Sequence, residues 1–289
     1  MKKSNKAIIC AALSGNMTTK KNNPNVPYTP EEFAEESHRC QEEGAAIIHF
    51  HAKDLESGLG TMDVDANRRI FEAIKERCPE LIINISTGAV FETAEVRVKP
   101  IEVIKPEMCS FNTSSMNFAF VDYKSGQVIM ETIYKNTFED MVKWAKAMNE
   151  AGSRPEFEIF DSGGINSLLI LDKQEGLFNH PMNFQFVYGI AGGMSFDPML
   201  HLSMASILPE GSTFSVCGVG PQQYSAAFIS LITGGHVRVG LEDNVRLPDK
   251  SLAKGSWDQV IWARNLVQTA ARGVASPDEA RAILGLQVP

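Results

Sequence analysis

Residues 45–52, which read AAIIHFHA, form the stretch of this chain that decides its fold. A short apolar run that follows a glycine is typical of a buried β-strand. Because residues i and i+2 of a strand point to the same face, His49 and His51 can reach one metal ion. Paired imidazoles at a strand end favour zinc, with other divalent ions as alternatives. The competing interpretation is a pair of hydrogen-bonded core histidines.

Further segments of the same kind recur along the chain, and helical patterns separate them. The eight predicted strands cover residues 7–14, 45–52, 81–87, 108–112, 156–161, 183–188, 213–219 and 236–241. The clearest helical patterns cover residues 29–44, 65–78, 137–152, 221–233 and 257–271, and a final short helix covers residues 276–285. Eight strand–helix units in 289 residues favour a parallel, closed (β/α)8 barrel, also called a TIM barrel. We expect residues 1–289 to form a single α/β domain, with the last helix as a short extension.

A doubly wound sheet is the alternative architecture for this pattern. It requires a glycine-rich dinucleotide turn after the first strand, and residues 14–18, SGNMT, do not form one. The strands also divide into two faces, since Phe157 and Ile159 alternate with Glu156 and Glu158. In a barrel the apolar set contacts the helices, and the polar set points inward near the strand ends where barrel enzymes keep their active sites.

Composition narrows the class of protein and its surroundings. The net charge is -8, which argues against a nucleic-acid or anionic-membrane partner. No segment approaches the roughly 18 apolar residues that a membrane span needs, and the apolar stretch near the N-terminus is too short for a signal peptide. The five cysteines have no paired spacing, so we expect them to be reduced and the protein to be cytoplasmic.

A third metal ligand is expected where residues 235–244 read GHVRVGLEDN. Arg238 and Glu242 share a face of this strand, so Glu242 can join the two histidines in a His2Glu site with one open position. Asp243 turns inward only if the strand has ended before it. The competing interpretation of both acids is a solvated acidic loop.

Other polar groups are expected at the same end of the barrel. Arg238 is charged within an apolar strand and needs a carboxylate partner, which is either Asp243 or a substrate carboxylate. Ser86 shares a face with Asn84 and should reach the barrel mouth, although a plain strand cap is the simpler explanation. Glycine-rich loops at residues 192–195 and 218–220 would let backbone N–H groups approach an anion, but such loops are common in barrels.

The motifs of this chain, taken together, resemble the family of β-keto acid cleavage enzymes, whose best-known activity is the cleavage of 3-keto-5-aminohexanoate. The motifs are IHFHA at residues 48–52, ISTG at 85–88, QFVYGIAGGMS at 185–195 and GGHVRVGLEDN at 234–244, together with the stretch at 105–118. The resemblance extends over nearly the whole chain.

The resemblance implies a zinc-dependent barrel that binds one Zn²⁺ per chain and assembles as a homotetramer. It implies a Claisen-type exchange in which a β-keto acid and acetyl-CoA give acetoacetate and a new acyl-CoA. By position, the zinc ligands of the family are matched by His49, His51 and Glu242. A relay that removes the α-proton of the substrate is matched by Ser86, Arg238 and Asp243. Substrate-binding positions are matched by Met17, Thr87, Gly88 and Ser115.

One position departs from the family pattern. Members that act on the amino substrate carry an acid in the loop after the first strand, where this chain has Met17. A thioether does not pair with an ammonium group, so we expect a β-keto acid with an uncharged tail. A zinc-dependent hydrolase or aldolase on the same barrel is the alternative function, and a requirement for CoA would separate the two. A non-catalytic metabolite-binding barrel is a third interpretation.

Overall fold

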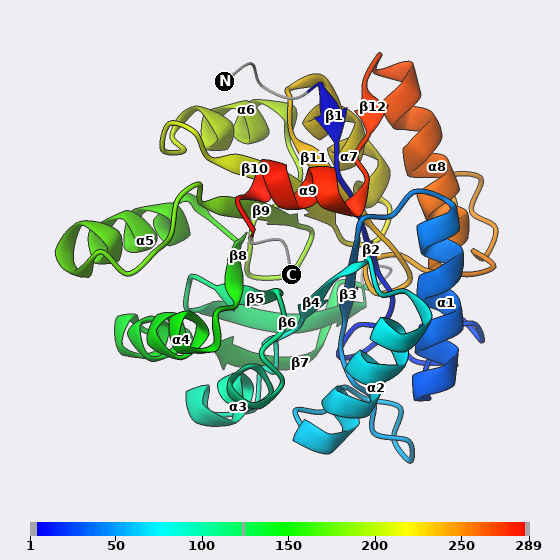
Figure 1. Cartoon of the computed structure of the whole chain (residues 1–289), viewed down its shortest axis with the longest axis horizontal. Coiled ribbons are helices and arrows are strands. Elements are labelled where there is room, and N and C mark those ends of the chain that lie inside the picture. The colour runs from blue at the N-terminus through cyan, green and yellow to red at the C-terminus, as the bar shows by residue number, and fades with distance from the viewer. Residues whose placement is uncertain (1–4, 123–124, 287–289) are drawn as a thin grey trace.

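Eight parallel strands close into a barrel in the computed structural model, which describes residues 5–122 and 125–286 (Figure 1). Around the barrel the strands follow the order β10 (Thr213–Gly218), β11 (His236–Val239), β2 (Ile9–Ala12), β3 (Ile47–Phe50), β4 (Ile82–Ile85), β5 (Met108–Asn112), β8 (Arg154–Ile159) and β9 (Asn183–Tyr188). Each of the eight predicted segments contains or overlaps one of these strands. The predicted TIM barrel is therefore confirmed.

Helices return the chain between strands and cover the outside of the barrel (Figure 1). They are α1 (Pro30–Glu42), α2 (Val64–Arg77), α3 (Ala94–Ile104), α4 (Phe138–Ala151), α5 (Ser162–Glu175), α6 (Pro198–Ser206), α7 (Gln222–Ile232) and α8 (Ser256–Thr269). Local sequence sets where they begin. Thr29 accepts a hydrogen bond from the backbone N–H of Glu32, whose carboxylate accepts from the N–H of Thr29, and Thr137 and Asp140 repeat this capping box at α4.

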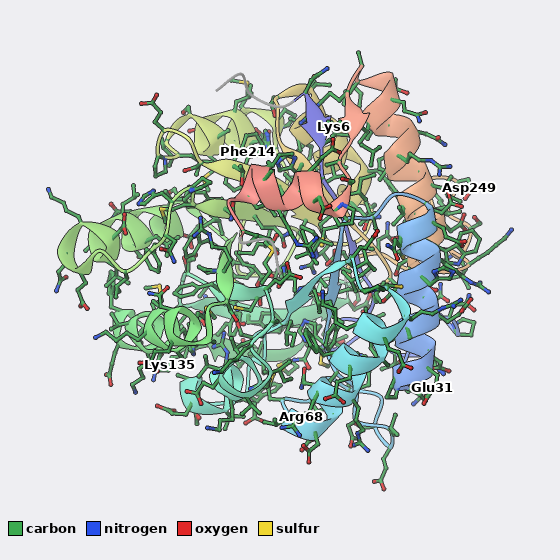
Figure 2. The ribbon with its side chains drawn as sticks, viewed as in Figure 1. Lys6, Glu31, Arg68, Lys135, Phe214 and Asp249 are labelled. Carbon is green, nitrogen blue, oxygen red and sulfur yellow. The ribbon has the colours of Figure 1, made fainter. Side chains whose placement is uncertain are left out.

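The strands bury different residues on their two faces. Outward-facing apolar residues such as Ile48, Phe157 and Phe184 pack with the helices in one large core, which includes Trp144 of α4. Figure 2 shows charged side chains, among them those of Glu31, Lys135 and Asp249, projecting from the outside of the molecule. In the described part of the chain, no helix has the length and apolar character that crossing a bilayer requires.

A ninth helix closes the end of the barrel at which the strands begin. This helix, α9 (Pro277–Leu284), lies across the strands and is red in Figure 1. Its Leu284 packs in a second apolar cluster with Cys10, Ile47 and Met108 from inside the barrel, and Asn183 Nδ2 donates to the carbonyl of Leu284 over 3.1 Å. Beside it, β1 (Lys6–Ala7) pairs with β12 (Gly273–Val274). Among the residues that the structure describes, α9 and this cluster fill most of this end of the barrel.

An antiparallel hairpin, which the sequence does not predict, stands at the opposite end of the barrel. Its strands are β6 (Met116–Asp122) and β7 (Gln127–Tyr134), and it follows β5 directly. Ala119 of the hairpin forms an isolated antiparallel bridge with Ala191, in the loop after β9. The hairpin is therefore attached across the open end of the barrel.

Candidate active site

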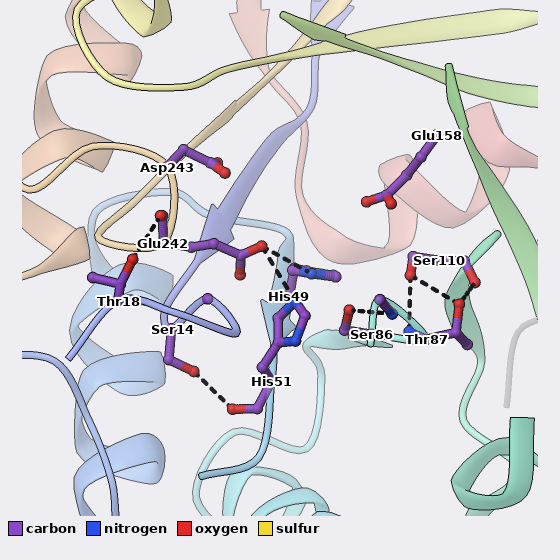
Figure 3. A network of polar contacts seen from close by, with 12 residues as sticks. Ser14, Thr18, His49, His51, Ser86, Thr87, Ser110, Glu158, Glu242 and Asp243 are labelled. Carbon is purple, nitrogen blue, oxygen red and sulfur yellow. Dashed lines mark hydrogen bonds and ion pairs between the residues drawn. The ribbon is translucent and has the colours of Figure 1, made fainter. Parts of the chain in front are cut away.

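Three of the predicted side chains meet at the open end of the barrel (Figure 3). His49 lies in β3 and His51 just after it, whereas Glu242 follows the end of β11. Oε1 of Glu242 lies 3.6 Å from Nε2 of His49 and 3.4 Å from Nε2 of His51. One ligand atom from each residue fits within 4.8 Å of the others, a spacing suited to one metal ion.

The residues present fit a divalent cation. Both ring nitrogens of His49 and Oε2 of Glu242 are buried and have no hydrogen-bond partner, which is costly unless another group satisfies them. Burial favours the neutral form of Glu242, but the Arg238 guanidinium and the two imidazoles hold its pKa well below the usual range. Burial also lowers the pKa of His51, which favours the neutral imidazole that binds metals.

A glycine explains why the acids after β11 turn inward. Gly240 has φ +149°, and a Cβ at this position would lie 2.1 Å from the carbonyl oxygen of Ala12. Only glycine can therefore follow this path past β2. The strand ends at Val239, and Glu242 and Asp243 both point into the barrel. This early end is the condition under which the sequence predicts that Asp243 turns inward.

The loop after β2 fixes the other side of the cluster. Ser14 Oγ donates to the carbonyl of His51 over 2.8 Å, and Thr18 Oγ1 donates to the carbonyl of Glu242 over 3.1 Å. The buried ammonium group of Lys53 donates to the carbonyls of Gly15 and Thr18. The backbone on both sides of the cluster is thus held by hydrogen bonds from Ser14, Thr18 and Lys53.

Arg238 is paired rather than free. Its Nε and Nη2 donate to the two carboxylate oxygens of Asp243, each over 2.8 Å, in a bidentate arrangement. Nη2 also donates to Oε1 of Glu242 over 2.5 Å, and Nη1 donates to Gln185 over 3.1 Å. Arg238 and Asp243 are both almost fully buried. Of the two partners expected for Arg238, the structure therefore shows Asp243.

Glu158 is a further acid of the site whose role the sequence leaves open. It lies in β8 with its carboxylate pointing into the barrel, 3.5 Å from Nη1 of Arg238 (Figure 3). Burial raises its pKa to about 7. With its amide oriented to satisfy its neighbours, Asn112 donates to Glu158 over 2.9 Å and to the hydroxyl of Tyr134 over 3.0 Å. The alternation of polar and apolar residues in β8 predicts that the side chain of Glu158 points into the barrel.

A cavity of about 300 Å³ lies above these groups. Ser86, Gly88 and Met17 line it, together with Arg238 and Asp243, so five of the seven predicted catalytic or substrate-binding residues face one space. Its lining combines the charged side chains of Glu158, Arg238 and Glu242 with a larger number of apolar side chains. The backbone N–H of Gly88 donates to Ser86 Oγ over 3.1 Å, which holds the hydroxyl in place.

The two remaining predicted residues do not line this cavity. The hydroxyl of Thr87 donates to the carbonyl of Ser110 over 2.8 Å, between β4 and β5. Ser115 Oγ accepts a hydrogen bond from the backbone N–H of Asn136 over 2.8 Å, at the base of the hairpin. Both hydroxyls are engaged in contacts between neighbouring segments, and a role of Thr87 and Ser115 in substrate binding stays a prediction.

One side of the cavity is apolar, and the sequence does not predict this side. A small hydrophobic cluster stands above the end of β8, β9 and β10, and most of its members line the cavity. We call these lining residues the apolar wall: Val90, Phe118, Phe160, Val187, Ile190 and Cys217. They come from five separate segments of the chain, so no local sequence motif predicts that they meet.

A buried arginine ties the hairpin to the loop that carries Ser86. Nε of Arg97, in α3, donates to the carbonyl of Thr87 over 2.8 Å, and Nη2 donates to the hydroxyl of Tyr134 over 2.9 Å. Nη1 donates to Oδ1 of Asn136 over 2.8 Å. The guanidinium carbon lies 4.3 Å from the ring centroid of Trp144 and 4.8 Å from that of Tyr134. Arg97 thus uses neutral oxygens and ring faces as its partners.

Comparison with known proteins gives the same family over the whole length. A family model described as beta-keto acid cleavage enzyme matches residues 6–286. The 3-keto-5-aminohexanoate cleavage enzyme of Fusobacterium nucleatum is 39% identical over 283 residues, which cover 98% of each chain. The 3,5-dioxohexanoate:acetyl-CoA acetone transferase of Paraburkholderia graminis is 31% identical and covers 98% of this chain and 96% of its own.

Solved structures agree on the fold. The binary complex of ObcA with oxaloacetate superposes with a TM-score of 0.72 at 21% identity, over 92% of this chain and 68% of that chain. At this identity the likeness concerns the barrel alone. The match of the family model and the identity to these relatives go further, and they show that this chain belongs to the family of β-keto acid cleavage enzymes.

Proposed function

We propose that this enzyme is a zinc-dependent transferase that exchanges a β-keto acid with acetyl-CoA to give acetoacetate and a new acyl-CoA. The observation that carries the proposal is the shared cavity. His51 and Glu242 of the metal-ligating set, with the unpartnered buried Oε2 of Glu242, line the same cavity as the Arg238–Asp243 pair, and buried His49 lies directly behind them. Relatives of this chain are named as acetyl-CoA transferases of 3,5-dioxohexanoate and of 3-oxoadipate, which supports acetyl-CoA as the co-substrate.

The first step is removal of a proton from the carbon between the two carbonyl groups of the β-keto acid. Asp243 is the base, because its carboxylate is held in one plane by two hydrogen bonds from Arg238. Ser86, fixed by Gly88, assists as the relay hydroxyl. Zinc held by His49, His51 and Glu242 would supply a Lewis acid that stabilises negative charge on the keto oxygen.

The remaining steps exchange the acyl groups. The carbanion attacks the acetyl carbonyl carbon of acetyl-CoA, and the CoA thiolate leaves with the electron pair of the broken C–S bond. The thiolate then adds to the original keto carbon, whose bond to the central carbon breaks. That electron pair stays on the central carbon, which takes back a proton to give acetoacetate, while the tail leaves as an acyl-CoA.

We also propose that the tail is uncharged, that the protein is cytoplasmic and that it assembles as a homotetramer. Met17 lies at the cavity without a neighbouring acid in its loop, which supports the first point. The cysteines are unpaired and buried, which suits a reducing compartment. Exposed Met199, Phe228 and Ile232 on α6 and α7 offer apolar surface for assembly, which light scattering would measure.

The experiment is a coupled assay on zinc-loaded protein, with acetyl-CoA and β-keto acids that carry neutral, anionic and cationic tails. Acetoacetate and acyl-CoA should form in equal amounts, only with acetyl-CoA present, and activity should disappear after chelation and return with zinc. His51→Ala should lose bound metal and turnover, whereas His180→Ala, at an exposed histidine outside the cavity, should keep both. Cleavage without CoA would instead favour the hydrolase or aldolase.

A further inference from the structure

The apolar wall is one face of a packed cluster that turns towards the cavity. Phe160, Val187 and Cys217 are almost fully buried, whereas Phe118 and Ile190 are half-buried and face the open space. The wall is continuous with Met116 and Tyr134 of the hairpin. A contiguous apolar surface inside a functional cavity usually has an apolar ligand to cover it.

The β8 and β9 part of the wall stands opposite the two histidines, whereas Cys217 in β10 and Val90 after β4 lie at the edges of the wall, beside the strands of the metal-ligating set. In the closed ring of eight strands, β3 is four places from β9 and β11 is four places from β5. The histidines belong to β3, whereas Val187 is in β9 and Phe160 follows β8. A β-keto acid whose keto oxygen lies at the metal set therefore has its tail directed across the mouth towards the wall.

Charges in the cavity are already engaged with one another. The charged lining residues in the described part of the chain are Glu158, Arg238, Glu242 and Asp243, and His51 also lines the cavity. Arg238 contacts all three of the carboxylates. The carboxylate on the wall side is Glu158, two residues before Phe160, and it already lies 3.5 Å from Nη1 of Arg238, so a cationic tail would have to compete with that guanidinium. An anionic tail would lose its hydration against phenylalanine rings without a cation in return.

We propose that the apolar wall receives the tail of the substrate, so that the substrate class is β-keto acids with a hydrocarbon tail. This inference rests on the proposed function. Phe118 and Ile190 determine the accepted tail, because the bridge between Ala119 and Ala191 holds their two segments together at the wall. Each additional methylene covered by the wall should raise kcat/KM about fourfold, until the cavity is filled.

The test begins with a reaction that has the shortest tail. Acetoacetate and acetyl-CoA labelled with ¹³C in the carbonyl exchange their acetyl groups, so label appears in acetoacetate with no net reaction. This exchange uses every catalytic group but only a methyl tail. Absence of exchange in the metal-loaded enzyme would contradict the proposed function itself, and is distinguishable from any failure of the wall to select tails.

The second part compares 3-oxopentanoate, 3-oxohexanoate and 3-oxooctanoate with 3-oxo-5-aminohexanoate and 3-oxoadipate, at saturating acetyl-CoA. We expect kcat/KM to rise with chain length and charged tails to react at least tenfold more slowly than neutral tails of similar length. Exchange that proceeds with no dependence on tail length, or with a preference for a charged tail, would overturn the inference.

Variants test whether the apolar wall causes the dependence of kcat/KM on the tail of the substrate. Ile190→Ala should reduce the ratio of kcat/KM for 3-oxohexanoate to that for 3-oxopentanoate, and Phe118→Lys should shift preference towards 3-oxoadipate. Ile129→Ala, an exposed hairpin residue that does not line the cavity, is the matched control and should keep the wild-type ratio. If Ile190→Ala instead raised KM for acetyl-CoA and left the ratio unchanged, the wall would serve the CoA arm, and the inference would be wrong.

Discussion

Asp243 shows how a single side chain depends on its neighbours for its chemistry. A carboxylate is a weak base for a carbon-bound proton, so its position and its ionised state both matter. Two hydrogen bonds from Arg238 fix the plane of the carboxylate, and burial excludes water that would compete for its oxygens. The same arginine contacts Glu242, so the proposed base and the proposed metal ligand share one cation.

Replacing Asp243 by asparagine tests the role of the base. Asp243→Asn keeps the size of the side chain and one hydrogen-bond acceptor but removes the proton acceptor. We expect kcat to fall by about 10²–10⁴-fold while the zinc content and the fold stay as in the wild type. Asp249→Asn, on the exposed surface, is the control. Full activity of Asp243→Asn would assign proton removal to another group.

Metal binding should also stabilise the fold. An ion that binds only the folded state adds about 2.7 kcal/mol to the free energy of unfolding at a hundredfold excess over its Kd. Zinc should therefore raise the Tm of the metal-free wild type, and His49→Ala should show no such rise. A differential scanning measurement with and without zinc decides this, and an equal rise in both proteins would place the ion elsewhere.

Individual residues were predictable to different degrees. His49 and His51 were predictable because the period of two in a strand is local geometry. Asp243 required the strand to end early, which depends on the contact of Gly240 with β2 rather than on local sequence. Thr87 and Ser115 could not be placed, because side chains outside strands have no fixed direction, and both hydroxyls bind neighbouring segments instead.

At the level of elements, the hairpin contributes more to the cavity than its sequence suggests. Exposed Ile129 and Ile133 face away from the barrel, whereas Phe118 and Tyr134 face the cavity. Apolar residues therefore occur on both sides of the hairpin, and no alternation of polar and apolar residues marks it as a pair of strands. Only the position of the hairpin at the open end of the barrel shows that it lines the cavity.

Arg97 should control how the hairpin is held. Arg97→Met keeps the packing volume but removes the donor to the carbonyl of Thr87 and to Oδ1 of Asn136, at a cost of about 1–3 kcal/mol for each buried group, and it also removes one of the two donors to the Tyr134 hydroxyl. We expect a lower free energy of unfolding in urea and a higher KM for the β-keto acid, with kcat changed less. Lys99→Met, on the exposed face of the same helix, should change neither quantity. An unchanged KM in Arg97→Met would show that the hairpin does not depend on this arginine.

At the scale of the whole molecule, closure of the barrel joins distant parts of the chain. The alternation of strands and helices predicted eight units and their order, but not the register between them. The pairing of β11 with β2 connects residues more than two hundred positions apart. Across this junction the backbone N–H of Ile8 donates to Nδ1 of His236 over 3.1 Å.

His236 makes the stability of this barrel junction depend on pH. Burial, together with the charge of Arg272, lowers the pKa of His236 to about 3, so the folded protein keeps the ring neutral while the unfolded chain binds a proton below pH 6.5. Stability from this group is present above pH 6.5 and is lost as the pH falls, by about 1.4 kcal/mol per pH unit, towards pH 3. His236→Asn retains an acceptor for Ile8 but does not titrate.

Urea unfolding between pH 7 and pH 4 measures this contribution. The wild type should lose stability more steeply with falling pH than His236→Asn. His236→Ala, which also lacks the acceptor, should be less stable than the wild type at pH 7 as well. Equal slopes for the wild type and His236→Asn would show that other groups control acid unfolding.

The separation of the two histidines from Glu242 along the chain also has a consequence for biosynthesis. The ribosome makes His49 and His51 early, and Glu242 only after most strands have been made. Until β11 arrives, β2 has an unpaired edge, and the growing chain offers two imidazoles without their carboxylate. A pair of imidazoles follows the intrinsic affinity order, in which copper binds more tightly than zinc. Only the closed barrel brings all three proposed ligands together, so we expect the proposed zinc to be acquired after translation has passed Glu242.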